Sequence, residues 1–404
     1  MSMFRFTLDN SRKIALITFF ANLYFYNHIG TLYQLARGLS LTEIGSITSV
    51  ILATIFIAEI PTGVIADKIG YKWSVVVAFM LQALGEFMYL FARSYPVFIL
   101  IAVVAGLGYA FLSGAQESLV YETLPNENKD EGMKKAMGRI GSYYQLAFFI
   151  APIMGGFIVS QLTLSKYMLA ILLTACSVFI AFLISLTLKG AKKEKTHNDQ
   201  NPIIIFKEGF KEIQKSRNLL WILLLAVFTS SFSNSLFSLY QPYFSQNNVP
   251  AMWLGWALSL GALLAFFIQK YIHHIDLFLG KYAVFYLTIW PGFMYILLFF
   301  THSPLLLIPM FIVTYASTEA KSPLFSSVQN NLISDKHRAT VLSFISMFTR
   351  CYTAIMALVL GRIADSSISM AFLVMGILII FFTVIFKTYR LSIVTHAKEE
   401  VLIA

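Results

Sequence analysis

The sequence predicts an all-α integral membrane protein with twelve transmembrane helices in two pseudo-symmetric six-helix bundles. Three observations lead to this fold class. Of the 404 residues, 58% are hydrophobic and 12% are charged, whereas about a quarter of the residues of a soluble domain are charged. The apolar residues fall in runs of about twenty, the length that crosses a bilayer as a helix. Turns of similar composition recur at matching places in the two halves of the chain, which indicates an internal repeat.

The apolar runs define twelve predicted spans. A helix of about twenty residues rises about 30 Å, which matches the hydrocarbon thickness of a membrane. The first run is too long for a signal peptide and lacks a small-residue cleavage site, so it is expected to be a retained span. The spans cover residues 13–34, 42–66, 72–92, 96–122, 138–161, 166–188, 218–241, 252–273, 281–300, 304–330, 339–363 and 367–388.

The distribution of lysine and arginine predicts the orientation. With the N-terminus inside, 24 of the 30 basic residues fall in inner segments and 4 fall in outer ones, as the positive-inside rule requires. Both termini are therefore expected to be cytoplasmic, in a multi-pass protein of the cell membrane. The same distribution accounts for the net charge of +10 by orientation in the membrane, and it predicts no nucleic-acid partner.

One long polar stretch divides the chain into two halves. Residues 1–188 are predicted to form the N-terminal six-helix bundle, residues 189–217 a cytoplasmic linker and residues 218–404 the C-terminal six-helix bundle. The linker contains an amphipathic segment with lysines on its polar side, which is expected to lie along the anionic inner leaflet. Recruitment of a partner protein is the alternative.

The turns after spans 2 and 8 resemble each other. Asp67, Gly70 and Lys72 of the first turn recur as Asp276, Gly280 and Lys281 in the second. Two six-span halves with similar turns are typical of duplicated transporters, in which the ligand site lies between the halves near the middle of the membrane.

The turn between spans 2 and 3 also resembles the signature loop of the major facilitator superfamily. This resemblance implies a transporter, and it assigns Asp67 to a cytoplasmic gate at which the carboxylate faces the N-terminal end of a helix in the other half. Tyr71 departs from the family pattern, which usually has a basic residue there. A positively flanked, solvated turn is the alternative. The residues that carry the resemblance are Gly63, Asp67, Lys68, Gly70 and Lys72.

Span 5 resembles a motif of the exporter branch of that superfamily. The matching residues are Gly138, Pro152, Gly155 and Gly156, and alanine replaces glycine at two further positions. The resemblance implies efflux by proton antiport. Exporters of this type often carry an arginine in span 4, and residues 101–108 contain none. A general face of small residues for helix packing is the alternative.

Ionisable and polar residues inside the spans are the candidate site residues, because they are costly in a membrane. Glu117 and Glu319 are the predicted proton-coupling residues, with snorkelling or an inter-helix hydrogen bond as the alternative. Arg350 is placed near the middle of span 11, where it is expected to bind a polar or anionic substrate group or to pair with a carboxylate, with a purely structural ion pair as the alternative. The other predicted cavity residues are amides and tyrosines of spans 1 and 7: Asn22, Tyr26, Tyr33, Asn234 and Gln241.

The chain lacks the motifs of enzymes and ATP-driven pumps. It contains no phosphate-binding loop, no His-Glu-x-x-His and no Gly-x-Ser-x-Gly, and its two cysteines have no metal-ligand spacing. We therefore expect a monomeric transporter without cofactor or metal, with a small-molecule substrate and protons as the coupling ion. The predicted function is proton-coupled efflux of a small amphipathic molecule or metabolite by alternating access. Uptake of a sugar or other polar metabolite, by symport or facilitated diffusion, is the alternative.

Overall fold

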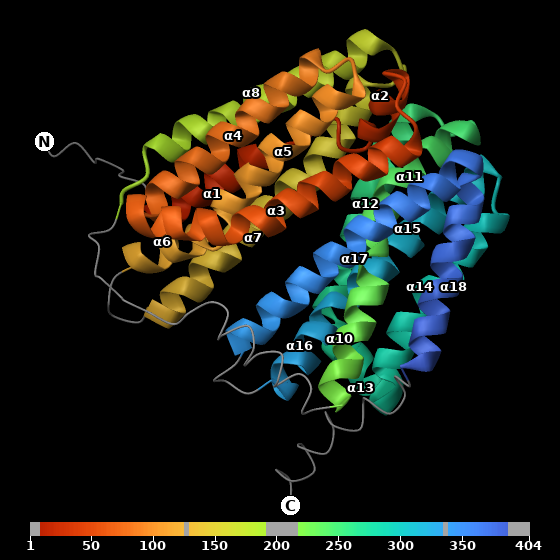
Figure 1. Cartoon of the computed structure of the whole chain (residues 1–404). Coiled ribbons are helices and arrows are strands. Elements are labelled where there is room, and N and C mark those ends of the chain that lie inside the picture. Colours follow the sequence, from red (N-terminus) through yellow and green to blue (C-terminus); the bar gives the residue numbers. More distant parts are fainter. Residues whose placement is uncertain (1–8, 125–128, 191–216, 334–337, 387–404) are drawn as a thin grey trace, which may run out of the picture. The chain divides into compact units, whose positions relative to one another are not determined.

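The computed structural model describes residues 9–124, 129–190, 217–333 and 338–386, and in this part of the chain every regular element is a helix (Figure 1). The predicted linker lies outside the described residues except at its two ends. The first half contains α1 (Asn10–Ala21), α2 (Gly30–Ala36), α3 (Leu41–Ile69), α4 (Tyr71–Phe91), α5 (Tyr95–Leu112), α6 (Ala115–Thr123), α7 (Lys129–Ile158) and α8 (Leu164–Leu186). The second half contains α10 (Arg217–Ser230), α11 (Phe232–Gln246), α12 (Ala251–Lys270), α13 (Ile272–Leu279), η1 (Gly280–Tyr282), α14 (Ala283–Phe300), α15 (Pro304–Ala320), α16 (Ser322–Leu332), α17 (Arg338–Ser366) and α18 (Ile368–Ile385).

Each of the twelve predicted spans contains one or two of these helices. Among the described residues, nine stretches are long and apolar enough to cross a membrane. The three other predicted spans are interrupted or more polar. The first is broken at residues 22–29, the fifth has the polar run 142–145 in α7, and the tenth contains Glu319 and Lys321.

The helices form two compact units, and together they make an all-α fold of two six-helix bundles. Unit 1 comprises the described residues among 1–39, 50–196 and 254–259. Unit 2 comprises those among 40–49, 197–253 and 260–404. The first turns of α3 therefore pack within unit 2, and residues 254–259 of α12 pack within unit 1.

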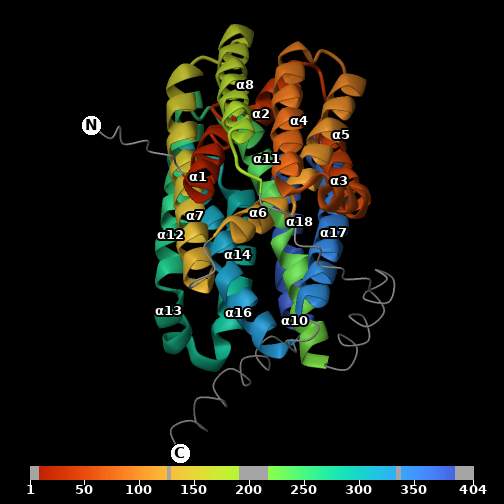
Figure 2. The ribbon, with the colours of Figure 1, turned by 90° about the vertical axis from the view of Figure 1, so that its left-hand side faces the viewer.

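Equivalent helices pack in the same order within each unit. In unit 1, α4 lies between α5 and α8 (Figure 2), and α1 packs against α7 and α8. In unit 2, α14 packs against α15 and α18, and α10 packs against α16, α17 and α18. Small residues allow the closest of these approaches: a Cβ atom on Gly376 of α18 would lie 2.7 Å from the Gly292 carbonyl oxygen of α14. Close backbone contact of this kind drives helix association in membranes.

A pair of buried tyrosines shows the repeat at the level of single hydrogen bonds. In unit 1, the Tyr33 hydroxyl lies 3.1 Å from the Tyr89 carbonyl oxygen and 3.5 Å from that of Ala92, at the end of α4. In unit 2, the Tyr243 hydroxyl lies 2.9 Å and 2.8 Å from the carbonyl oxygens of Leu298 and Thr301, at the end of α14. Carbonyls at a helix end have no partner within the helix, so each tyrosine caps the third span of its own bundle.

The two similar turns also adopt similar backbone conformations. Gly70 precedes α4 with φ 90°, and Gly280 precedes α14 with φ 53°. Residues with a side chain rarely adopt such angles, whereas glycine does so readily. The turn resemblance read from the sequence therefore corresponds to a shared need for glycine at the same place in both bundles.

Candidate functional site

The first predicted span is unwound in its middle. Helix α1 ends at Ala21 and α2 begins at Gly30, so residues 22–29 have no regular helix. Irregular backbone at membrane depth is tolerated only where protein buries it or where it lines a hydrated cavity. The backbone N–H of Phe25 donates to the Thr174 hydroxyl of α8 at 3.0 Å. This side chain satisfies one backbone donor that the break leaves without a helical partner.

The unwound segment is held in place by small residues of α7. A Cβ atom on Gly155 would lie 1.9 Å from the Phe25 carbonyl oxygen, so only glycine permits the observed contact. Gly155 belongs to the exporter-like motif, and in this structure its role is to seat the unwound segment. A Cβ atom on Gly138, at the other end of the motif, would meet nothing within 4 Å.

Five residues of unit 1 form what we call the Glu86 cluster: Tyr24, Tyr26, Glu86, Tyr89 and Tyr109. The Tyr26 hydroxyl donates to Glu86 Oε2 at 2.9 Å, and Tyr24 hydrogen-bonds to the same carboxylate and to Tyr109. The Tyr24 and Tyr26 rings meet edge to face at 5.7 Å, and Tyr26 stacks on Tyr89 at 5.3 Å. The unwound segment thus brings two tyrosines onto a carboxylate of α4.

The other predicted residues of span 1 lie elsewhere. The Asn22 side chain donates to the Thr18 carbonyl at 2.7 Å, at the end of α1. Tyr33 is fully buried and accepts a hydrogen bond from Arg37 Nε at 3.1 Å. The sequence predicts one helical face for Asn22, Tyr26 and Tyr33, and the structure does not form it because the helix ends before Tyr26.

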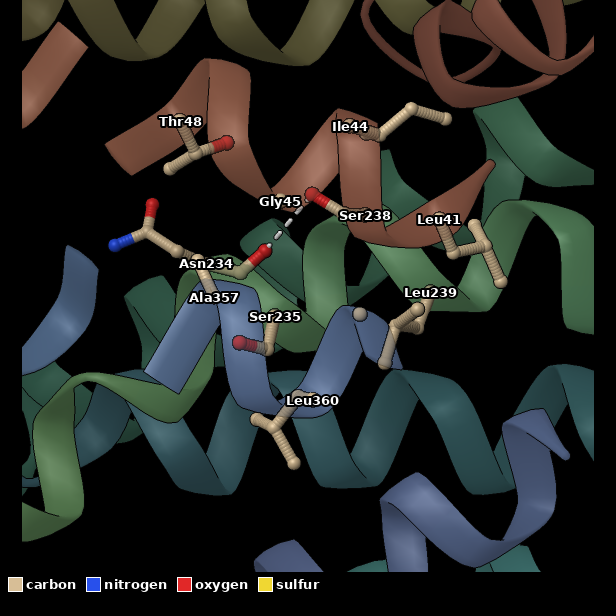
Figure 3. A pocket seen from close by; sticks show the side chains of 11 residues that line it. Leu41, Ile44, Gly45, Thr48, Asn234, Ser235, Ser238, Leu239, Ala357 and Leu360 are labelled. Atoms are coloured by element: carbon tan, nitrogen blue, oxygen red, sulfur yellow. Dashed lines mark hydrogen bonds between the residues drawn. The ribbon is translucent and has the colours of Figure 1, made fainter. Parts of the chain in front are cut away.

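The predicted cavity residues of unit 2 have separate surroundings. Gln241 is buried, and its amide donates to the Phe237 carbonyl within α11 at 3.1 Å. Arg350 is half-buried on α17 and makes contacts there. Asn234 lines a small cavity of about 30 Å³ with Ser238, whose hydroxyl donates to the Asn234 carbonyl (Figure 3). Ligand pockets are typically about 300 Å³ or larger, so this cavity suits water rather than a substrate.

The two predicted coupling carboxylates lie next to helix breaks in equivalent spans. Glu117 is exposed in the first turn of α6, which follows a break at Gly114 with φ 71°. Glu319 is half-buried at the end of α15, two residues before the break at Lys321. Within the described residues of unit 1, Glu117 forms no hydrogen bond with the Glu86 cluster.

Lys321 is a buried cation in unit 2. Its side chain is 2% exposed, and Nζ donates to the Thr229 carbonyl at 2.8 Å. Thr229 lies directly before the break between α10 and α11, so one ammonium group connects the breaks of spans 7 and 10. A lysine within a span is visible in the sequence, but this connection depends on how the helices pack.

The predicted gate motif lies at the end of α3 and the start of α4. Asp67 accepts a hydrogen bond from the Tyr71 hydroxyl at 3.2 Å. Gly63 and Lys68 are exposed, and the Lys72 ammonium lies 5.2 Å from the Trp73 ring centre. Tyr71, the departure from the family pattern, therefore holds the carboxylate that the motif places at the gate.

Within unit 2, the first turns of α3 pack closely on α17, and we call this contact the α3–α17 seam. A Cβ atom on Gly45 would lie 2.2 Å from the Ala357 carbonyl oxygen, and the Ser49 hydroxyl donates to the Ala354 carbonyl at 2.6 Å. The Asp365 carboxylate accepts from the backbone N–H of Leu41 at 2.7 Å. A carboxylate at a helix N-terminus satisfies free N–H groups and is favoured by the helix dipole.

Unit 1 contains an equivalent contact, the α7–α12 seam. A Cβ atom on Gly255 of α12 would lie 2.0 Å from the Pro152 carbonyl oxygen of α7. The Ser259 hydroxyl donates to the Phe149 carbonyl at 2.8 Å. Each seam thus combines a glycine set against a carbonyl with a serine one turn later that donates to another carbonyl. Sequence reasoning missed both seams, although the matching Gly-x-x-x-Ser pairs were available as a signal.

Sequence comparison finds one protein family and two relatives that are similar to this chain. The sequence model of the Major Facilitator Superfamily matches residues 14–332. The uncharacterized MFS-type transporter YxaM of Bacillus subtilis (strain 168) is 23% identical over 327 residues, which cover 80% of this chain and 80% of that protein. The quinolone resistance protein NorA of Staphylococcus aureus (strain MRSA252) is 22% identical over 245 residues, which cover 59% of this chain and 60% of that protein.

Solved structures share the fold over nearly the whole chain. A mutant of the nucleoside transporter NupG matches with a TM-score of 0.77 at 15% identity, covering 94% of this chain and 100% of that one. A bacterial homolog of the human lysosomal transporter Spinster, in an inward-facing and unoccupied conformation, matches with a TM-score of 0.74 at 14% identity, covering 96% and 97%. At these identities the likeness concerns the fold.

Proposed function

Because the chain belongs to the Major Facilitator Superfamily and is a membrane transporter of that type, we propose that it exports a small amphipathic molecule or metabolite in exchange for protons. It works by alternating access as a secondary active transporter, and it is not an enzyme. The similarity to NorA, a quinolone resistance protein, supports export as the direction. The exporter-like motif of α7 supports the same direction through Gly155, which seats the unwound segment.

The observation that carries this proposal is that helix breaks occur in four equivalent spans. The first, fourth, seventh and tenth spans are interrupted at residues 22–29, Gly114, Ser231 and Lys321. In transporters, discontinuous helices surround the sites for substrate and coupling ion, because the breaks free backbone groups and helix ends for binding. Glu117 and Glu319 each lie within one turn of such a break, and this supports their role as the proton-coupling carboxylates.

The proposal includes the substrate path and the gates. Asn22, Tyr26, Tyr33, Asn234, Gln241 and Arg350 are the proposed cavity residues, and Tyr26 has the strongest support because its hydroxyl contacts an embedded carboxylate. Asp67, held by Tyr71, belongs to the proposed cytoplasmic gate. We place the chain in the cell membrane as a monomer of two bundles joined by the linker, with both termini in the cytoplasm.

Transport in everted membrane vesicles tests the proposal. An imposed gradient with acidic lumen is expected to drive a fluorescent amphipathic substrate into the vesicles, and substrate addition is expected to release protons from the lumen. The double variant Glu117→Gln, Glu319→Gln should lose the response to the gradient. Glu131→Gln on the exposed start of α7 is the matched control, since its only partner shown here is Lys135. Unchanged pH dependence in the double variant would falsify the coupling assignment.

Uptake of a sugar or other polar metabolite is the second candidate. It is favoured by α5, whose residues 101–108 contain no arginine of the kind that exporters often carry there. The vesicle experiment separates the two functions, because a symporter moves substrate together with protons, out of an acidic lumen, whereas an antiporter moves it inward against them.

A further inference from the structure

We propose that the Glu86 cluster is the binding site for an organic cation, such as an ammonium or phosphonium group carried by the transported molecule. This inference rests on the proposed function, because it names the substrate class of the same transporter. It differs from the sequence-based expectation, which centred on amides and Arg350 and favoured a polar or anionic group.

The charge of the Glu86 cluster favours a cationic ligand. Glu86 lies within the span formed by α4, five residues before the end of this helix, and ionisable side chains within spans are costly and commonly functional. In the described part of the chain, the partners of its carboxylate are the hydroxyls of Tyr24 and Tyr26, and no lysine or arginine forms an ion pair with it. A carboxylate that the protein supplies with hydrogen bonds but with no counter-charge is suited to bind a cation from outside.

The tyrosine rings of the cluster favour an organic cation over a metal ion. Tyr24 and Tyr26 hydrogen-bond to the carboxylate, and the Tyr24–Tyr26 and Tyr26–Tyr89 ring centres are 5.7 Å and 5.3 Å apart. Tyr109 hydrogen-bonds to Tyr24 and lies close enough to Glu86 to interact with its charge. Ring faces attract cations, by about 2 kcal/mol or more where water is excluded, and aromatic cages are the usual sites for quaternary ammonium groups. A divalent metal ion would need several oxygen ligands, and among the described residues no group of three His, Cys, Asp or Glu side chains is close enough to hold one.

The exposed side chain of Tyr109 gives access to the cluster. Tyr109 of α5 is 42% exposed and interacts with Tyr144 of α7, which is 40% exposed. Around Tyr144, the exposed face of α7 is mainly polar or small, with Gly138, Gly141, Ser142 and Gln145, and the exposed apolar side chain of Leu146 adjoins it. Such a face is unsuited to lipid and suited to water. A cation can therefore reach Tyr109, and through it Glu86, from the hydrated face of unit 1.

Equilibrium binding to the purified full chain in detergent micelles tests the proposal without any gradient. The probes are tetraphenylphosphonium and benzyltrimethylammonium, and tetraphenylborate serves as an anion of nearly the same shape as the first. We expect the wild-type protein to bind the cations and not the anion. Glu86→Gln should weaken cation binding about tenfold or more, and Glu86→Asp, which keeps the charge, should retain part of it.

Two variants of Tyr109 separate the effect of the ring from that of the hydroxyl, and a surface variant controls for general damage to the protein. Tyr109→Leu should weaken cation binding by about fivefold or more, whereas Tyr109→Phe, which keeps the ring, should weaken it less. Glu131→Gln on the surface of α7 should bind like the wild type. Absence of binding by both cations, equal binding of the borate, or wild-type affinity in Glu86→Gln would each overturn the proposal.

Failure of the cation-site proposal can be distinguished from failure of the proposed export function. If Glu86 binds only a proton, neither cation binds and the vesicle experiment still detects proton-coupled export. If the cations bind but the gradient moves no substrate, the site stands and the direction or coupling of transport is wrong.

Discussion

Replacing Lys321 is expected to affect the stability of the protein and its transport activity in different ways. Its ammonium group is buried and hydrogen-bonds to one carbonyl, of Thr229. Taking an ammonium group out of water costs several kcal/mol, and an apolar side chain of similar length at this position would not carry that cost. Because this lysine connects two helix breaks, we expect it to have a role in transport.

We therefore predict that Lys321→Met keeps or raises the midpoint of thermal unfolding and lowers transport about tenfold or more. The midpoint is measured in detergent and transport in vesicles with the same preparation. Lys270→Met is the control, because Lys270 is exposed at the end of α12. A clear fall in the unfolding midpoint of Lys321→Met, or unchanged transport, would contradict a functional role.

At the scale of elements, the break in the first span decides where the site lies. It depends on Gly155 of α7 and on the Thr174 hydroxyl of α8, both of which contact Phe25. The unwound segment in turn places Tyr24 and Tyr26 on Glu86. A substitution in α7 that moves the backbone of residues 22–29 is therefore expected to alter the hydrogen bonds of the Glu86 carboxylate in α4.

Gly155→Val is expected to push the unwound segment away from α7, since even its Cβ would overlap the Phe25 carbonyl oxygen. Overpacking of this kind costs about 1–3 kcal/mol or more, and we expect a lower unfolding midpoint together with weaker substrate binding. Gly138→Val in the same helix is the matched control, because a Cβ there meets nothing within 4 Å. Equal unfolding midpoints and equal substrate binding in the two variants would show that the contact between Gly155 and Phe25 does not matter for stability or binding.

The sequence predicts the spans well and this site poorly, for a physical reason. Apolar runs and the turn glycines Gly70 and Gly280 are local, and the structure has the helices and both turns where they are expected. The break at 22–29 is set by contacts with α7 and α8, which lie more than a hundred residues away. Tyr26 was predicted to line a cavity, but its partner Glu86 could be identified only once α4 and the unwound segment were placed together.

For the whole molecule, the α3–α17 and α7–α12 seams are the contacts that alternating access is expected to open and close. Each lies within one unit, and each joins a helix start to a helix of the other half of the sequence. Ser259 follows Ser49 by 210 positions, as Tyr243 follows Tyr33. The two seams are thus copies of one another and are expected to work together.

A disulfide across either seam should stop transport. The variants are Ser49→Cys with Ala354→Cys, and Ser259→Cys with Phe149→Cys, in a chain whose free cysteines Cys176 and Cys351 are replaced by serine. Transport in vesicles is expected to fall to background after oxidation and to return after reduction. The single cysteine variants serve as controls. Full transport by a cross-linked protein would show that the seam in question stays closed throughout the cycle.

The composition of the seams has a consequence for the rate at which the protein changes state. Gly45 and Gly255 contribute no side chain, so at these two positions the helices separate without pulling a side chain out of a packed surface. Within lipid there is also no hydrophobic gain from keeping the helices together. Few hydrogen bonds, each worth about 1 kcal/mol, then resist opening: the serine bond of each seam and, in the α3–α17 seam, the bonds that Asp365 accepts from the start of α3. Such a contact is expected to favour neither state strongly, so that a modest difference in free energy between the two sides of the membrane would suffice to set the direction of the cycle.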